Sequence, residues 1–202
     1  MRWVCGLMLV LLLGLSVSSP VRADDAGVRA ELISLWSKML ASKDLAYRAH
    51  MVTTDKKGRK FESTMAVQWP NRFHMKNPDS EMIILPQGTW MNAGGNWMKM
   101  PMDMSKMIQQ YTPDAIKAGM DGIRAVSFLG ESDVNGKNCK QYRYDFDSKV
   151  MGIRSTGTAT ISLDASTGFP VRMETTGEAM GQKSSTVVDY EYDPTIRITA
   201  PN

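Results

Sequence analysis

Methionine thioethers are the most concentrated source of metal-binding chemistry in this chain of 202 residues, which contains 17 methionines. The densest run comprises Met98, Met100, Met102, Met104 and Met107. Soft thioether ligands select Cu(I), so three closely spaced methionines could form a copper site. The same flexible, polarizable side chain also adapts to apolar ligands of varied shape, or fills a core. The run by itself leaves three interpretations open: a copper site, a lining for an apolar ligand, and core packing alone.

The other residues that could take part in catalysis or bind zinc lack the partners that these roles would need. The chain has two histidines, His50 and His74, and no spacing typical of a zinc site. Cys139 is the single cysteine after residue 23, and its strand-like surroundings predict an inert buried thiol. Asp145 and Asp147 share one face of a predicted strand, whereas a glycosidase needs carboxylates that face each other across a cleft. We therefore predict a protein that is not an enzyme, with no catalytic residue, no metal centre and no cofactor.

The N-terminus has the features of a secretion signal. Arg2 precedes an apolar run at 4–15, and small residues at 21–23 suit signal peptidase. We expect cleavage before Asp24, which removes 1–23 as a signal peptide and leaves 24–202 as a single periplasmic domain. Loss of two arginines lowers the formal net charge from +3 to +1. This near-neutral balance argues against nucleic acid as a partner.

One local basic cluster, at 56–60, lies between two strand-like runs. We interpret it as the tip of a hairpin. In one interpretation the tip is simply solvated, and in the other it makes a weak contact with anionic lipid headgroups.

The elements that must position these residues follow from hydrophobic periodicity. Apolar residues at three- and four-residue spacing predict a helix at 28–40, and 103–120 has the pattern of two short helices. Period-two alternation and turn residues predict the strands. These lie at 46–52, 61–69, 72–76, 81–85, 89–93, 96–99, 126–134, 140–146, 154–163, 170–176 and 184–192. The order predicts an α+β fold in which an antiparallel curved sheet forms an open barrel, with helices covering one side.

The stretch at 67–101 resembles the periplasmic lipoprotein-carrier family, the LolA-like proteins. That family has a strand ending in a Pro-Asn-x-Phe motif, then a Pro-Asp turn, an aliphatic strand, a Gly and Trp close together, and a further proline. The corresponding residues here are Trp69-Pro70-Asn71-Arg72-Phe73, Pro78-Asp79, Met82-Ile83-Ile84-Leu85, Gly88-Thr89-Trp90 and Pro101. The order of helix, strands, helical insert and strands also fits the family along most of the chain after residue 23.

The resemblance implies a half-barrel of about eleven strands, with a helical lid over an apolar cavity. It also implies that the ligand is a lipid or the acyl chains of a lipoprotein, and that the protein performs no catalysis. One position departs from the family. The carrier members have an arginine before the proline, which pins the lid shut through hydrogen bonds, and this sequence has Trp69 there.

We therefore expect a monomeric periplasmic protein that holds a lipid or an acylated lipoprotein, as a carrier in outer-membrane lipoprotein sorting would. Membrane-associated donor and acceptor proteins would be its further partners. The alternatives are a methionine-rich Cu(I)-binding protein and a sensor or interaction module on the same fold. The residues expected to line the cavity are large and apolar: Trp69, Phe73, Met75, Ile83, Leu85, Trp90, Trp97, Met98, Met100, Met104, Met107, Ile108 and Met120.

Overall fold

The computed structural model describes residues 26–42, 44–101, 117, 119–150 and 153–201. The expected signal peptide therefore lies outside the described residues, as does most of the expected helical insert at 103–120. Within the described parts, no helix is both long enough and apolar enough to cross a membrane.

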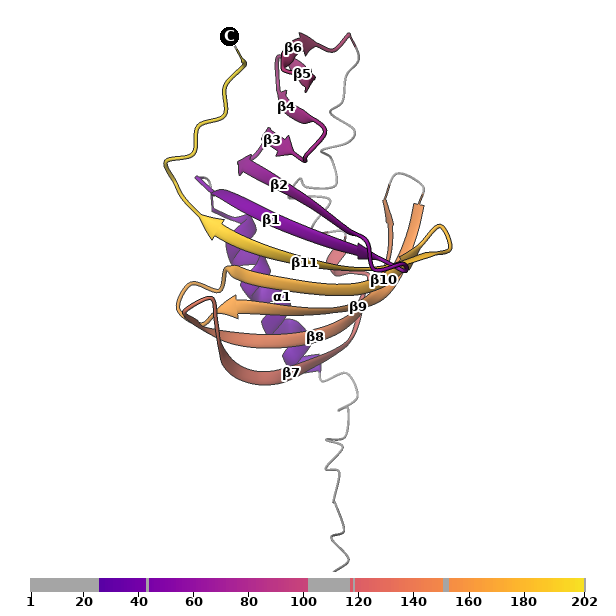
Figure 1. Ribbon diagram of the computed structural model, residues 1–202. Coiled ribbons are helices and arrows are strands. Elements are labelled where there is room, and N and C mark those ends of the chain that lie inside the picture. The colour runs from indigo at the N-terminus through magenta and orange to yellow at the C-terminus, as the bar shows by residue number, and fades with distance from the viewer. Residues whose placement is uncertain (1–25, 43, 102–116, 118, 151–152, 202) are drawn as a thin grey trace, which may run out of the picture.

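A single antiparallel sheet of eleven strands forms the body of the molecule (Figure 1). Its spatial order is β6-β5-β4-β3-β2-β1-β11-β10-β9-β8-β7, and the sheet stays open because β6 and β7 stand at opposite edges. This arrangement confirms the predicted α+β fold with an open half-barrel. The strands are β1 (Ala46–Asp55), β2 (Lys60–Gln68), β3 (Arg72–Lys76), β4 (Glu81–Leu85), β5 (Gly88–Ala93), β6 (Asn96–Lys99), β7 (Ile123–Val134), β8 (Lys137–Val150), β9 (Ile153–Asp164), β10 (Pro170–Ala179) and β11 (Gln182–Tyr192).

Helix α1 (Ala26–Leu40) packs across one face of the sheet, as the apolar spacing predicted (Figure 1). Leu32 is 0% exposed and lies in a cluster with Val126 of β7 and Ile161 of β9. The rings of Trp36 and Tyr144 meet edge to face at 5.8 Å between centroids. Such aromatic pairs are worth about 1 kcal/mol beyond the area they bury. We call the sheet face that contacts α1 the helix face, and the opposite one the outer face.

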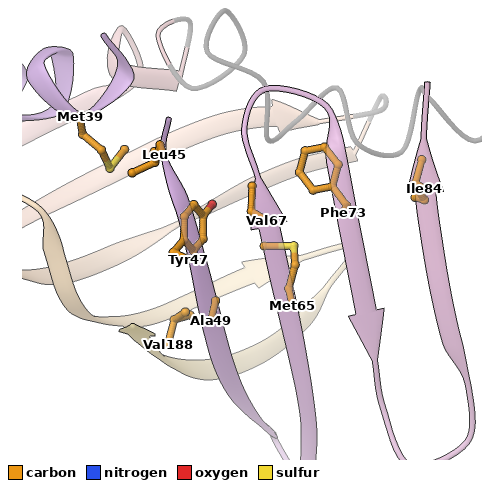
Figure 2. Close-up of a cluster of buried hydrophobic side chains, with 9 residues drawn as sticks. All are labelled: Met39, Leu45, Tyr47, Ala49, Met65, Val67, Phe73, Ile84 and Val188. Carbon is orange, nitrogen blue, oxygen red and sulfur yellow. The ribbon is translucent and has the colours of Figure 1, made fainter. Parts of the chain in front are cut away.

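A second core cluster lies on the helix face of the first strands (Figure 2). Its members come from α1, the segment before β1, and strands β1, β2, β3, β4 and β11: Met39, Leu45, Tyr47, Ala49, Met65, Val67, Phe73, Ile84 and Val188. Alternation along each strand sends every second side chain into this cluster. This alternation is the physical basis of the predicted curved sheet.

The outer face of the same strands is covered by the C-terminal segment, which we define as residues 193–201. Ile196 and Ile198 of this segment are buried against Ala46, Ile83 and Leu85. The sequence analysis assigned no role to this segment.

Hydrogen bonds to the backbone of Ile198 help to hold the C-terminal segment in place. The Ile198 N–H donates to Gln68 Oε1 at 3.0 Å, and Arg72 Nη1 donates to the Ile198 carbonyl at 3.0 Å. The segment therefore covers part of the outer face, over β1 and β4.

The tip of the β7–β8 hairpin folds over to reach β11. Asn135 Nδ2 donates to Asp189 Oδ1 at 2.8 Å, and the guanidinium of Arg172 donates to both Asp189 oxygens, at 2.7 and 3.0 Å. These charge-assisted bonds hold the pKa of Asp189 below its usual range, mainly through Arg172. They tie the β7–β8 turn to β10 and β11.

A glycine pair allows two neighbouring strands to approach an aromatic ring on β8. Gly157 of β9 pairs with Gly177 of β10 on one side and with Phe146 of β8 on the other. A Cβ atom at residue 157 would lie 2.9 Å from Phe146 Cζ and would also meet the backbone of β10. Glycine is therefore required here by the close approach of the strands.

Candidate functional site

An apolar pocket of about 290 Å³ lies between α1 and the helix face of the sheet. A volume of this size stands at the lower end of the range for small-ligand sites, roughly 300–1,000 Å³. Side chains from α1, β7, β8, β9 and β10 supply its walls, together with one glycine before β7. The lining residues are Trp36, Gly119, Ile123, Tyr144, Phe146, Ser148, Ala159, Met173 and Thr175.

Among the described residues, no carboxylate or amine lines this pocket, and the polar side-chain groups of its lining are hydroxyls. The buried Tyr144 hydroxyl donates to Met173 Sδ at 3.8 Å, and burial raises the pKa of this tyrosine, which keeps it neutral. Ser148 and Thr175 contribute the other hydroxyl groups. A neutral, mostly apolar lining favours a hydrocarbon ligand, because a charged ligand would lose its hydration without gaining a partner.

A row of methionines crosses the helix face on the other half of the sheet. Each methionine pairs directly with the next across neighbouring strands, so all five side chains share one face. Directly opposed residues have Cβ atoms about 5 Å apart. We call this row the methionine ladder, and its members from β2 to β6 are Met65, Met75, Met82, Met91 and Met98.

Exposure along the methionine ladder increases toward the free edge of the sheet. Met65 is 4% exposed, the next three are half-buried, and Met98 on the edge strand is 56% exposed. The ladder therefore begins in the core and ends as an accessible apolar surface. Thioethers in such a row suit either a flexible hydrocarbon ligand or a soft metal ion.

The structure divides the predicted lining residues between two faces. Phe73, Met75 and Met98 lie on the helix face, where Phe73 is fully buried. Trp69 is half-buried and packs against the same core cluster. Met120 is buried in the cluster around Leu32, and Met100 is half-buried just after β6. Three further candidates, Met104, Met107 and Ile108, lie outside the described residues.

Four predicted lining residues point to the outer face instead. Ile83, Leu85, Trp90 and Trp97 pack with the C-terminal segment and share no wall with Phe73. The physical reason is strand alternation, which turns Ile83 and its neighbour Ile84 to opposite faces although both are apolar. The expectation that all these residues line one cavity is corrected accordingly, because these four side chains pack against the C-terminal segment of the same chain.

The sequence analysis named none of the residues that line the pocket under α1. Trp36, Phe146 and Met173 are among them, and only Met120, beside the pocket, was a candidate. A usable signal was present in the alternation of Tyr142, Tyr144 and Phe146, which matches a half-buried strand.

The described residues contain no cluster of three or more His, Cys, Asp or Glu side chains able to hold a metal ion. On the outer face, His74 Nε2 lies 2.6 Å from Glu81 Oε1, and these two side chains form a pair, not a cluster of three. Cys139 is fully buried, which confirms the prediction of a buried thiol, and burial raises its pKa. Raised thiol pKa values disfavour the reactive thiolate.

Comparison with known proteins shows the fold of the chain. No protein-family profile and no curated protein sequence matches it. Among solved structures, the lipoprotein LppX of Mycobacterium tuberculosis superposes with a TM-score of 0.59 and 9% identity, over 87% of this chain and 100% of LppX. LprF of Mycobacterium bovis gives a TM-score of 0.56 and 11% identity, over 85% of this chain and 97% of LprF.

A LolA superfamily protein of Nitrosomonas europaea also matches, with a TM-score of 0.34 and 7% identity, over 81% of this chain and 91% of that protein. At the identities of LppX and LprF, the likeness establishes a shared half-barrel and nothing about ligands. The fold is thus an open half-barrel of eleven strands like that of LppX and LprF, in agreement with the half-barrel that the resemblance at 67–101 implied.

Proposed function

We propose that this protein binds the acyl chains of a lipid or a lipoprotein on the helix face of its half-barrel, and carries them outside the cytoplasm. The observation that carries this proposal is the neutral apolar pocket between α1 and strands β7 to β10. The methionine ladder supplies a second apolar surface on the same face. Each methylene buried there contributes about 0.8 kcal/mol, so one acyl chain suffices for stable binding without polar contacts.

Replacing Thr175 with phenylalanine should block this pocket. Thr175 lines the pocket on β10, and a phenylalanine ring there would occupy the space of the bound chain. The next residue, Thr176, is exposed on the opposite face, so Thr176→Phe adds the same ring outside the pocket. We expect Thr175→Phe to lower the affinity for a fluorescent fatty acid at least tenfold and Thr176→Phe to leave it unchanged. Displacement titrations on the two variants provide this measurement.

Native mass spectrometry with organic extraction, on protein purified from the periplasm, tests the same proposal without a chosen probe. A phospholipid or an acylated peptide released on denaturation supports acyl-chain binding. A protein that carries no lipid and does not bind the fluorescent fatty acid contradicts it, and favours an interaction module with a filled core.

The methionine ladder specifically favours Cu(I) binding as a second candidate function. A triple variant, Met75→Leu with Met82→Leu and Met91→Leu, removes three thioethers but keeps apolar side chains of similar volume. If the ladder binds copper, this variant loses Cu(I) in a competition titration with a chromogenic chelator and still retains fatty acid. Equal Cu(I) binding by the variant and the parent protein excludes the ladder as a copper site.

A further inference from the structure

We propose that one end of the sheet is a docking surface for an anionic lipid bilayer, formed by the tips of the β1–β2 and β10–β11 hairpins and by the adjacent ends of β8 and β9, where the residues used are 149, 153 and 154. We call these three places the tips. The inference rests on the proposed function, because it identifies the surface through which an acyl chain would enter or leave.

Strand register brings the three tips to the same end of the molecule. Asp55, the last residue of β1, pairs with Ser184 near the start of β11. Ala179, the last residue of β10, pairs with Ser155 near the start of β9. Figure 1 shows the three hairpins together at the right of the sheet. The tips are therefore neighbours, although they are far apart in the sequence.

Among the described residues, each tip presents a large apolar side chain to solvent. The exposed fractions are 55% for Phe61, 43% for Ile153 and 77% for Met180. A single exposed apolar residue is ordinary on a protein surface, but three at neighbouring tips form a group. The Arg59 guanidinium lies 5.7 Å from the centroid of the Phe61 ring, and 55% of Phe61 nevertheless stays exposed.

Basic residues surround the three apolar side chains. Seven of them lie on or next to the tips: Lys56, Lys57, Arg59, Lys60, Lys149, Arg154 and Lys183. Four acidic residues lie in the same region: Asp55, Glu62, Asp147 and Glu178. This surface therefore has an excess of three positive charges, whereas residues 24–202 as a whole have a formal net charge near +1.

Two of the acidic residues are held within their own hairpins. Asp55 accepts a hydrogen bond from Arg59 at 2.7 Å, and Arg154 donates to Asp147 at 2.6 Å. These bonds hold the pKa values of both carboxyl groups below their usual range, Asp55 mainly through the backbone N–H of Arg59 and Asp147 through the Arg154 side chain. The lysines at the tips therefore remain as the cations available to an external anionic surface.

Apolar side chains flanked by lysine and arginine match the chemistry of a bilayer interface. The apolar groups enter the boundary between headgroups and acyl chains, while the cations contact anionic headgroups. A flat bilayer can contact all three tips at once, although they are separate in the sequence. A protein partner would need a concave surface matched to all three, so the observations favour a bilayer.

The apolar pocket lies close to the same end of the sheet. Ser148, which lines it, is the neighbour of Lys149 on β8, and Thr175 lies four residues before the end of β10. Docking through the hairpin tips would therefore bring the pocket toward the membrane surface. This placement gives an acyl chain a short path between bilayer and protein.

Vesicle co-sedimentation of the secreted, processed protein tests the proposal. The vesicles contain phosphatidylcholine and phosphatidylglycerol in equal parts, and pure phosphatidylcholine serves as the uncharged reference. The tip variant combines Lys57→Gln, Lys60→Gln and Lys183→Gln. The matched control combines Lys38→Gln, Lys137→Gln and Lys140→Gln, which remove the same charge away from the tips.

We expect the parent protein and the control to bind anionic vesicles and the tip variant to lose roughly fivefold in affinity per lysine. Phe61→Ser with Met180→Ser should weaken binding further, and high salt should weaken the parent. Equal binding by the tip variant and the control would overturn the docking surface, as would equal binding to both vesicle types or no binding to either. Fatty-acid affinity measured on the same samples reports separately on the proposed function, because all these substitutions lie outside the pocket.

Discussion

Replacing Ile198 with aspartate should lower the free energy of unfolding by about 3–5 kcal/mol, the range for an uncompensated charge left in a buried position. Ile198 is 4% exposed and packs against Leu85 and Ile83 on the outer face. Its backbone is hydrogen-bonded to Gln68 and Arg72, so the side chain cannot turn to solvent without breaking these bonds. Urea denaturation followed by tryptophan fluorescence measures this change.

The neighbouring residue supplies the matched control for this substitution. Thr199 is exposed, and Thr199→Asp places the same charge one position along the chain. We expect a change within about 0.5 kcal/mol, as for most surface substitutions. A loss below about 1 kcal/mol for Ile198→Asp would show that the C-terminal segment is weakly attached. Ile83, Leu85 and Trp90 would then be available as a second apolar surface for a ligand.

The residues packed between β4 and the C-terminal segment also show what the sequence could predict and what it could not. The period of two correctly placed β4 at 81–85, yet it could not assign Ile83 and Ile84 to different partners. Consecutive apolar residues in a strand indicate that both faces are covered, but they do not indicate which segment of the chain covers each face. Residues 196, 198 and 200 alternate as apolar positions, and this pattern was the available signal that the C-terminal segment is the cover.

The pocket under α1 could not be predicted for a different reason. Its walls combine Trp36 from the helix with Tyr144, Ala159 and Met173 from three strands. Only the register between β8, β9 and β10 brings these residues together, and register over long hairpins depends on the positions of turns and bulges. Local periodicity predicted the strands themselves, although β8 and β9 are longer at their shared hairpin than the alternation indicated.

Replacing Gly157 with valine should destabilise the protein by about 3 kcal/mol and also weaken acyl-chain binding in the pocket. The new side chain would overlap the Phe146 ring and the carbonyl of Thr176, where the strands approach too closely for any Cβ atom. Inserting atoms into a packed site typically costs about 1–3 kcal/mol, and a clash with backbone is less easily relieved than one with a side chain. Relief requires that β9 move away from β10, which displaces Phe146 from the wall of the pocket.

The control is Thr156→Val, which places valine at an exposed position of the same strand by exchanging a hydroxyl for a methyl group, and should change stability by less than about 0.5 kcal/mol. Thermal unfolding and fatty-acid titration of both variants separate two outcomes. If Gly157→Val loses stability and fatty-acid affinity together, the glycine pair sets the shape of the pocket. If stability falls while the folded variant binds fatty acid as the parent does, Phe146 is not part of the binding wall. The acyl chain must then lie further along the helix face, toward the methionine ladder.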